Sequence, residues 1–187
     1  TALLVLDVSG HGPLAGLVTM RLRAVMTVAL RSGFDPATAL ERAAISLADT
    51  DDGRFATALV AVLDPGASTV EWANAGHPAG WLLPGGSTTD RVRLRPTGPL
   101  LSSFGGRWVT GRSDLRVGDV LLAWSDGLVE TRSADDELDD DALAGVVAEL
   151  GTGEPGVLVP ELLARLRGGA REWRRDDITL VAVRRTS

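Results

Sequence analysis

The spacing of apolar and polar positions predicts one strand and two helices at the start of the chain. Residues 2–7 form a short apolar run that ends in a Gly-rich segment, which is typical of a fully buried strand. From Pro13 to Gly33 apolar residues recur every three or four positions, the pattern of an amphipathic helix. Asp35-Pro36 then begins a second helix that runs to about Leu47.

The centre of the chain predicts a block of strands. Short apolar runs alternate with Gly, Pro and Asp turn signals, the strongest of which is Asp64-Pro65-Gly66. This pattern favours one hairpin around that turn, a second across a Pro-Gly-Gly-Ser loop, and two strands around the turn at 116–119. The expected strands are Phe55–Leu63, Thr69–Ala75, Trp81–Leu83, Val92–Leu94, Trp108–Leu115 and Val120–Trp124.

The C-terminal part predicts two more helices and a last strand. The helices are expected near 139–150 and 157–171, and the buried strand at Ile178–Val183. Helix pairs that alternate with blocks of antiparallel strands favour an α+β layered sandwich. No segment reads as a linker, so we expect a single domain over residues 1–187.

Composition and charge exclude several classes of function. The chain has 187 residues and a net charge of −6, and an acidic surface disfavours nucleic-acid binding. It contains no cysteine, which excludes disulfides and zinc–thiolate sites and fits a reducing compartment such as the cytoplasm. No uninterrupted apolar run approaches the ~20 residues of a membrane helix, so we expect no membrane contact. The chain begins directly in a strand, which we interpret as the truncated N-terminal end of a fragment from a longer protein.

Acidic residues lie at the ends of three of the predicted strands, two at the close of a strand and one pair at the start of the last strand. They are Asp7, Asp126 and the pair Asp176-Asp177. Each alone also fits an ordinary turn or a charged strand edge. A carboxylate beside a dry core is costly, however, and three such placements predict one shared site for a hard cation. The carbonyl of Val8 is a further candidate ligand, because the loop that follows Asp7 exposes backbone oxygens.

Other chemistry finds little support in the sequence. There are only two histidines, His11 and His77, so a three-His zinc site is excluded. No serine lies in a Gly-x-Ser-x-Gly turn. We interpret His77, together with Asn74, as a residue that ties loop backbone groups, and Thr57 as an ordinary sheet residue.

Six short motifs carry a resemblance to a known family. In chain order they are Asp7-Val8-Ser9-Gly10-His11-Gly12, Asn74-Ala75-Gly76-His77-Pro78, Thr97-Gly98-Pro99-Leu100, Gly118-Asp119-Val120-Leu121-Leu122, Ser125-Asp126-Gly127-Leu128-Val129-Glu130 and Asp176-Asp177-Ile178-Thr179. As a set that covers essentially the whole chain, they resemble the SpoIIE-like branch of the metal-dependent PPM (type 2C) serine/threonine protein phosphatases.

The resemblance implies both a fold and a metal centre. The fold would be a four-layer αββα sandwich, in which two antiparallel sheets are flanked by helix pairs. Two Mn²⁺ or Mg²⁺ ions would be held by Asp7, the Val8 carbonyl, Asp126 and Asp176, and the three carboxylates would act in catalysis through a metal-activated water. Asp177 would then support the site without binding metal.

The resemblance also implies a role in signalling. The substrate would be a phosphorylated anti-sigma-factor antagonist, a STAS-domain protein of bacterial partner switching. An upstream sensor domain would control the enzyme in the cytoplasm, and homodimer formation stays open. One departure from the family favours an alternative, a catalytically impaired signalling module: the family's domain starts with an earlier strand that carries a further metal-binding Asp, and that strand is absent before Thr1. In a second departure, Ser9 stands where eukaryotic relatives carry a candidate general-acid histidine, so we assign His11 no such role. A dimerisation domain built on the helix from Pro13 to Leu30 is a third hypothesis.

Overall fold

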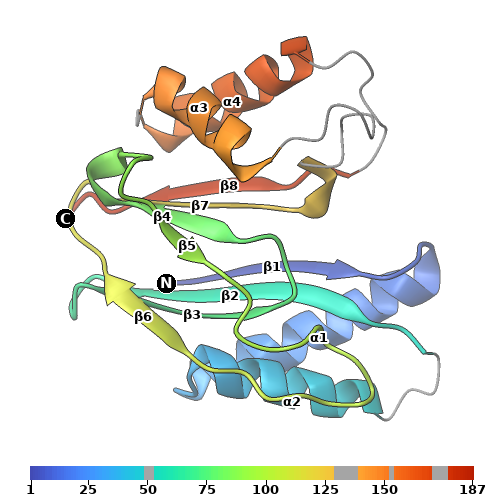
Figure 1. The fold of residues 1–187 in the computed structure, drawn as a ribbon. Helices are drawn as coiled ribbons and strands as arrows, with labels where there is room; N and C mark the ends of the chain where they lie inside the picture. Colours follow the sequence, from blue (N-terminus) through green and yellow to red (C-terminus); the bar gives the residue numbers. More distant parts are fainter. Residues whose placement is uncertain (49–52, 129–138, 152–153, 170–176) are drawn as a thin grey trace. The chain divides into compact units, whose positions relative to one another are not determined.

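The chain is organised as two compact units. The computed structural model describes residues 1–48, 53–128, 139–151, 154–169 and 177–187 (Figure 1). The first unit comprises Thr1–Ala79 and Leu94–Asp114, and the second Gly80–Arg93 and Leu115–Ser187. The single domain expected over residues 1–187 stays a prediction.

A four-stranded antiparallel sheet forms the first unit. Its order is β1-β2-β3-β6 (Figure 1). The predicted hairpin is confirmed, and its turn is closed by the Asp64 carboxylate, which accepts the Ala67 N–H at 3.0 Å. The strands are β1 (Ala2–Val8), β2 (Ala56–Asp64), β3 (Thr69–Ala75) and β6 (Gly111–Asp114).

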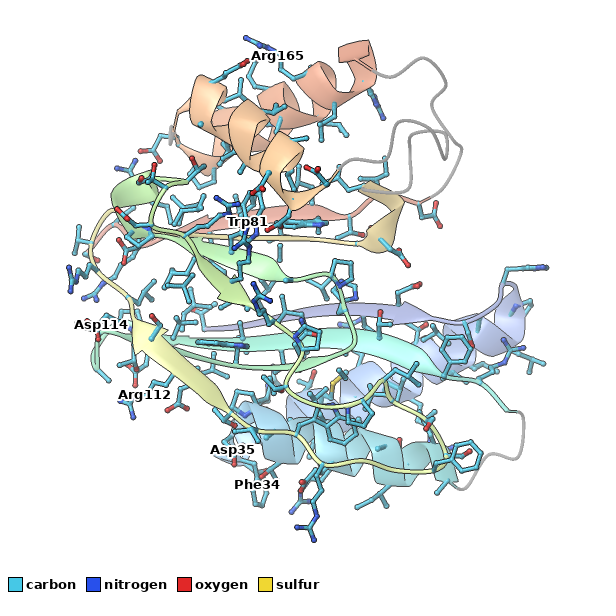
Figure 2. The ribbon with its side chains drawn as sticks, in the orientation of Figure 1. Phe34, Asp35, Trp81, Arg112, Asp114 and Arg165 are labelled. Carbon is cyan, nitrogen blue, oxygen red and sulfur yellow. The ribbon has the colours of Figure 1, made fainter. Side chains whose placement is uncertain are left out.

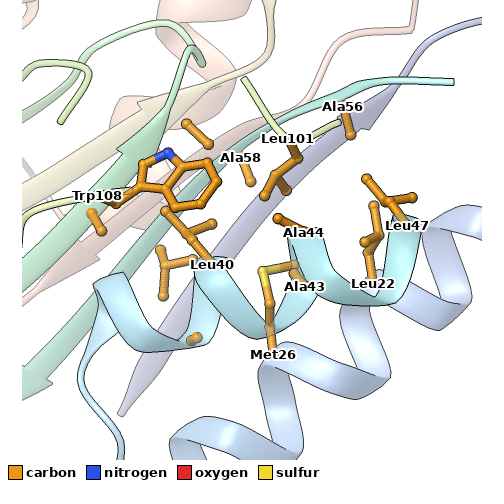
Figure 3. Close-up of a cluster of buried hydrophobic side chains, with 14 of the residues drawn as sticks. Leu22, Met26, Leu40, Ala43, Ala44, Leu47, Ala56, Ala58, Leu101 and Trp108 are labelled. Atoms are coloured by element: carbon orange, nitrogen blue, oxygen red, sulfur yellow. The ribbon is translucent and has the colours of Figure 1, made fainter. Parts of the chain in front are cut away.

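Two helices cover one face of this sheet. They are α1 (Pro13–Arg31) and α2 (Pro36–Ala48). Their inner faces pack with the sheet in one apolar cluster, in which Leu22, Met26 and Leu40 are fully buried (Figure 3). On β1 and β2 the residues of this cluster are even-numbered, because side chains of a strand alternate between the two faces of a sheet. The odd-numbered residues therefore point to the face without helices.

The start of α2 is held by Asp35 (Figure 2). Its Oδ1 accepts the backbone N–H of Ala37 at 2.9 Å and that of Thr38 at 3.1 Å, which satisfies two N–H groups of the first turn. The Thr110 hydroxyl donates to the same oxygen at 2.7 Å. Partial burial acts to raise the pKa of Asp35, but these hydrogen bonds outweigh it and lower the pKa below 3.8.

Asp35 predicts a pH-dependent contribution to stability. Asp35→Ala should lower the free energy of unfolding by about 1 kcal/mol at pH 7, the usual cost of losing a helix cap. Because the folded-state pKa is lowered, the charged carboxylate contributes stability above pH 3.8, and the contribution is lost as the pH falls through the lower folded-state value. Urea unfolding between pH 2.5 and 7 measures this. Asp35→Asn is the matched control, since its side chain keeps a capping oxygen but has no titratable carboxyl group. If the free energy of unfolding of that variant fell with decreasing pH as steeply as that of the wild type, the assignment would be contradicted.

The second unit also combines a four-stranded sheet with a helix pair. The sheet order is β5-β4-β7-β8 (Figure 1), and β7 is antiparallel to both of its neighbours. The helices pack on the face that carries Trp81, Leu122 and Trp124. The elements are β4 (Gly80–Leu83), η1 (Pro84–Gly86), β5 (Val92–Leu94), β7 (Val120–Trp124), η2 (Asp126–Leu128), α3 (Asp140–Leu150), α4 (Pro155–Gly169) and β8 (Leu180–Arg184).

Several sequence-based expectations need correction. The strand predicted at Trp108–Leu115 is only Gly111–Asp114, and it joins a different sheet from β7. The first and last strands are not fully buried, because each lies at the edge of its sheet and has one strand neighbour in the described part of the chain. The sequence predicts no membrane helix, but by length and composition alone α1 could cross a membrane. Core helices pass the same test, and α1 supplies Leu22 and Met26 to the core.

Candidate metal centre

Asp7 lies near the end of β1, and its side chain is exposed. It is paired in register with Thr57 of β2, and both residues are odd-numbered, so both side chains point to the sheet face without helices. The exposed carboxylate therefore lies on that face of the sheet. This exposure corrects the expectation of a carboxylate set against a dry core, because an edge strand leaves its end open to solvent.

The Val8 carbonyl has the orientation that a backbone ligand needs. Ser9 donates its N–H to the Phe55 carbonyl at 2.9 Å, which makes 9 and 55 a hydrogen-bonded pair of the ladder. Hydrogen-bonded and non-hydrogen-bonded pairs alternate along antiparallel strands, so Val8 and Ala56 form a non-hydrogen-bonded pair. In such a pair the N–H and C=O groups of each residue point away from the opposite strand. The Val8 carbonyl thus points toward the open edge of β1.

The loop after Asp7 is anchored to the chain before β2. The Ser9 hydroxyl accepts the Phe55 N–H at 3.1 Å, and the Arg54 guanidinium donates to the Ser9 carbonyl at 2.9 Å. Gly10 has a φ of 86°, and a Cβ there would lie 2.7 Å from the Arg54 Nη1. The backbone angle is the reason that this position favours glycine, because the end of the arginine side chain can move away from a Cβ.

Asp126 occupies the corresponding place in the second unit. It lies two residues after the end of β7, begins η2 and is half-buried. Its Oδ1 accepts the N–H of Gly127 at 2.9 Å, so the turn itself orients the carboxylate. Ser125 joins this turn to the chain that enters β8: its N–H donates to the Thr179 carbonyl at 2.9 Å, and its hydroxyl donates to the Asp177 carbonyl at 3.3 Å.

The acidic pair 176–177 is only partly described. Asp176 lies outside the described residues, so its choice as ligand stays a prediction. Asp177 is exposed, and its backbone lies beside Ser125, next to Asp126. Among the residues that the structure describes, no cluster of three or more His, Asp or Glu side chains could hold a metal. Asp7 and Val8 belong to the first unit and Asp126 to the second.

A set of buried hydrogen bonds surrounds His77, which lies two residues after the end of β3. Asn74 accepts the His77 N–H at 2.8 Å, donates to the His77 carbonyl at 3.0 Å and donates to the Leu94 carbonyl at 2.9 Å. The predicted backbone-tying role of Asn74 is thus confirmed. Sequence reasoning missed the contact of the His77 ring, whose Nδ1 lies 2.7 Å from the Thr57 hydroxyl. The sequence signal was that Thr57 is polar, whereas Leu59, Ala61 and Leu63, which lie on the same face of β2, are apolar.

Asn74 predicts a large effect on stability. Asn74→Ala would leave one buried N–H and two buried carbonyls without this partner, and we expect the free energy of unfolding to fall by about 3 kcal/mol. Urea unfolding followed by circular dichroism measures it. Asn74→Asp is the matched comparison, because it keeps the acceptor for His77 but loses both donors. A loss below 0.5 kcal/mol for the alanine variant would contradict this account.

Comparison with known families decides the affiliation. Residues 1–186 match the family of Stage II sporulation protein E (SpoIIE). The chain belongs to the SpoIIE family. The predicted resemblance is therefore confirmed, and the match includes the positions of all four predicted ligands.

Solved structures show the same fold for this SpoIIE-family chain. The PP2C domain of SiaA from Pseudomonas aeruginosa is similar with a TM-score of 0.81 at 19% identity, covering 98% of this chain and 75% of that one. The structure of the RsbU and RsbW domains of Rv1364c from Mycobacterium tuberculosis has a TM-score of 0.77 at 27% identity, and the match covers 99% of this chain and 51% of that one. The PP2C phosphatase domain of SpoIIE from Bacillus subtilis, with a fragment of its regulatory domain, has a TM-score of 0.77 at 17% identity, and the match covers 99% of this chain and 55% of that one.

These likenesses confirm the predicted fold class. The SpoIIE-family chain is an α+β protein with two antiparallel sheets, each accompanied by a helix pair, of the PP2C phosphatase type. It spans about half the length of the second and third structures. One further similar structure, the catalytic domain of the phosphatase PstP, is a complex with two manganese ions and has a TM-score of 0.63 at 16% identity.

Proposed function

We propose that this chain is a metal-dependent protein phosphatase that hydrolyses phosphoserine and phosphothreonine. The observation that carries the proposal is the SpoIIE-family match over residues 1–186, since it spans every predicted ligand. The proposed ligands are Asp7, the Val8 carbonyl, Asp126 and Asp176.

The chemistry of these donors fits a hard divalent cation. All four are oxygen donors, as Mg²⁺ and Mn²⁺ prefer. Asp7 is exposed on a sheet face, the Val8 carbonyl points away from its ladder partner, and Asp126 is held by its own turn. We propose two Mn²⁺ or Mg²⁺ ions as cofactors.

Each part of the chain would then have a defined task. When bound, the two ions would supply a water of lowered pKa and neutralise charge on the phosphoryl group. Asp7 and Asp126 would keep the donor oxygens in place, because Asp7 lies within β1 and Asp126 begins η2 just after β7. No nucleophilic side chain of this chain is required, which agrees with the absence of cysteine from the sequence.

We further propose a phosphorylated anti-sigma-factor antagonist with a STAS domain as the substrate, with an upstream sensor domain as regulator and the cytoplasm as the place of action. The proposal is supported by the family and by similar structures of RsbU and RsbW domains and from the bacterial stressosome. A panel of phosphorylated STAS proteins, offered with an unrelated phosphoprotein as control, tests it. Equal rates on all of them would contradict substrate selection.

Removal of metal tests the proposed chemistry directly. We expect hydrolysis of a phosphoserine peptide to fall to background after dialysis against EDTA and to return when Mn²⁺ or Mg²⁺ is added. The control is the same dialysis followed by Ca²⁺, whose larger and more flexible coordination suits the site less well. Turnover that persists in EDTA would exclude the metal mechanism, whereas weak or single Mn²⁺ binding without turnover would favour the signalling-module alternative.

A further inference from the structure

Asp7, Thr57 and His77 occupy one end of the first sheet on the same face. The register pairs Asp7 with Thr57, and side chains of directly opposed residues lie about 5 Å apart at Cβ. Their neighbours Val8 and Ala56 belong to the cluster beneath the helices, so Asp7 and Thr57 point to the opposite face. The Thr57 hydroxyl thus contacts the His77 ring, and Asp7 is the residue directly opposite Thr57 on the neighbouring strand.

The position of His77 is set by its surroundings. Its exposed fraction is 2%, and Asn74 binds both its N–H and its carbonyl. Gly76, with a φ of 69°, lets the chain turn so that the ring returns toward β2. A ring fixed in this way presents Nδ1 to the Thr57 hydroxyl at 2.7 Å.

The Thr57 hydroxyl has only one proton to donate, so the group to which it donates depends on the tautomer of His77. If Nδ1 carries a proton, the ring donates to Thr57 Oγ1, and the Thr57 O–H is left to donate elsewhere. If Nδ1 is bare, the Thr57 O–H donates to the ring instead. Only the first arrangement allows the hydroxyl to reach the carboxylate of its cross-strand partner.

We propose that His77 and Thr57 are positioning residues for Asp7: the His77 Nδ1–H donates to Thr57 Oγ1, and the Thr57 O–H donates to the Asp7 carboxylate. This inference rests on the proposed function, in which Asp7 is a metal ligand. Ligating carboxylates are themselves usually hydrogen-bonded, and loss of such a partner weakens metal binding. A buried histidine and a hydroxyl on an otherwise apolar stretch of strand would then serve the metal site, whereas a merely structural pair would satisfy only each other.

The tautomer of His77 tests the proposal without any activity measurement. Nitrogen NMR of the ¹⁵N-histidine-labelled protein distinguishes protonated from bare Nδ1, and the chain has only two histidines, so a His11→Gln variant completes the assignment. We expect a protonated Nδ1 on His77. A bare Nδ1 on His77 overturns the proposal, even if no variant at Thr57 or His77 can be prepared.

Mn²⁺ affinity provides the second measurement, by calorimetry with Mn²⁺ alone. Thr57→Val should weaken binding about tenfold, while Thr57→Ser, which keeps the hydroxyl, should stay within about twofold of wild type. His77→Asn, whose amide nitrogen can replace Nδ1–H, should bind more tightly than His77→Leu. Wild-type affinity in Thr57→Val overturns the inference.

Asp7→Asn separates this inference from the proposed function. If Asp7→Asn weakens Mn²⁺ binding and Thr57→Val does not, only the positioning role is wrong. If Asp7→Asn itself binds Mn²⁺ like the wild type, the metal assignment of the proposed function is wrong.

Discussion

Asp126→Asn is expected to lower the Mn²⁺-dependent turnover of a phosphoserine substrate by about a thousandfold, which corresponds to about 4 kcal/mol of transition-state stabilisation. Asparagine has nearly the same shape, and its carbonyl oxygen can still accept the Gly127 N–H that now binds Oδ1. The turn after β7 should therefore persist. What disappears is the negative charge that the proposed metal centre needs.

Steady-state hydrolysis of a phosphoserine peptide with saturating Mn²⁺ measures the effect. Asp90→Asn is the matched control: it makes the same chemical change in the second unit, on an exposed residue that is not a proposed metal ligand. Urea unfolding of both variants should resemble that of the wild type. Full residual activity in Asp126→Asn would refute the proposed mechanism, because that mechanism requires the negative charge of the Asp126 carboxylate.

The second large effect concerns Trp81, which joins β4 to the start of α3 (Figure 2). Its side chain is fully buried, and it meets Trp124 of β7 edge to face with ring centroids 4.8 Å apart. Its indole N–H donates to Asp140 at 3.1 Å. Arg91 lies over the ring and forms an ion pair with Asp141 at 2.8 Å, so apolar and charged contacts converge on one side chain.

Trp81→Ala should therefore lower the free energy of unfolding of the second unit by about 4 kcal/mol, the range for a large aromatic side chain removed from a core. Far-ultraviolet circular dichroism in urea measures it without reliance on tryptophan fluorescence. Trp81→Phe separates the two contributions, because it keeps an aromatic ring but loses the hydrogen bond to Asp140. A loss below 1 kcal/mol for the alanine variant would show that the second unit does not depend on this junction.

The sequence alone predicted the elements whose pattern is local. The helices at Pro13 and Pro36 begin where Pro and Asp predict, since helix starts depend on neighbouring residues. The β2–β3 hairpin was equally predictable, because Asp64-Pro65-Gly66 contains the turn itself. The chemistry of Asp7 and Asp126 could be proposed for the same reason: each directly follows or ends an apolar run.

Tertiary structure decided the features that depend on strand pairing. An apolar strand reads alike at the edge and at the centre of a sheet, so the exposure of β1, and of Asp7 on it, could not be read from its residues. The assignment of β6 and β7 to different sheets is likewise a long-range choice. Thr57 and His77 are 20 positions apart, and only the return of the chain after β3 brings the ring to the hydroxyl. The sequence by itself thus determined the helices, the hairpin and the candidate carboxylates, whereas register and pairing, which follow from packing between distant segments, determined what surrounds Asp7.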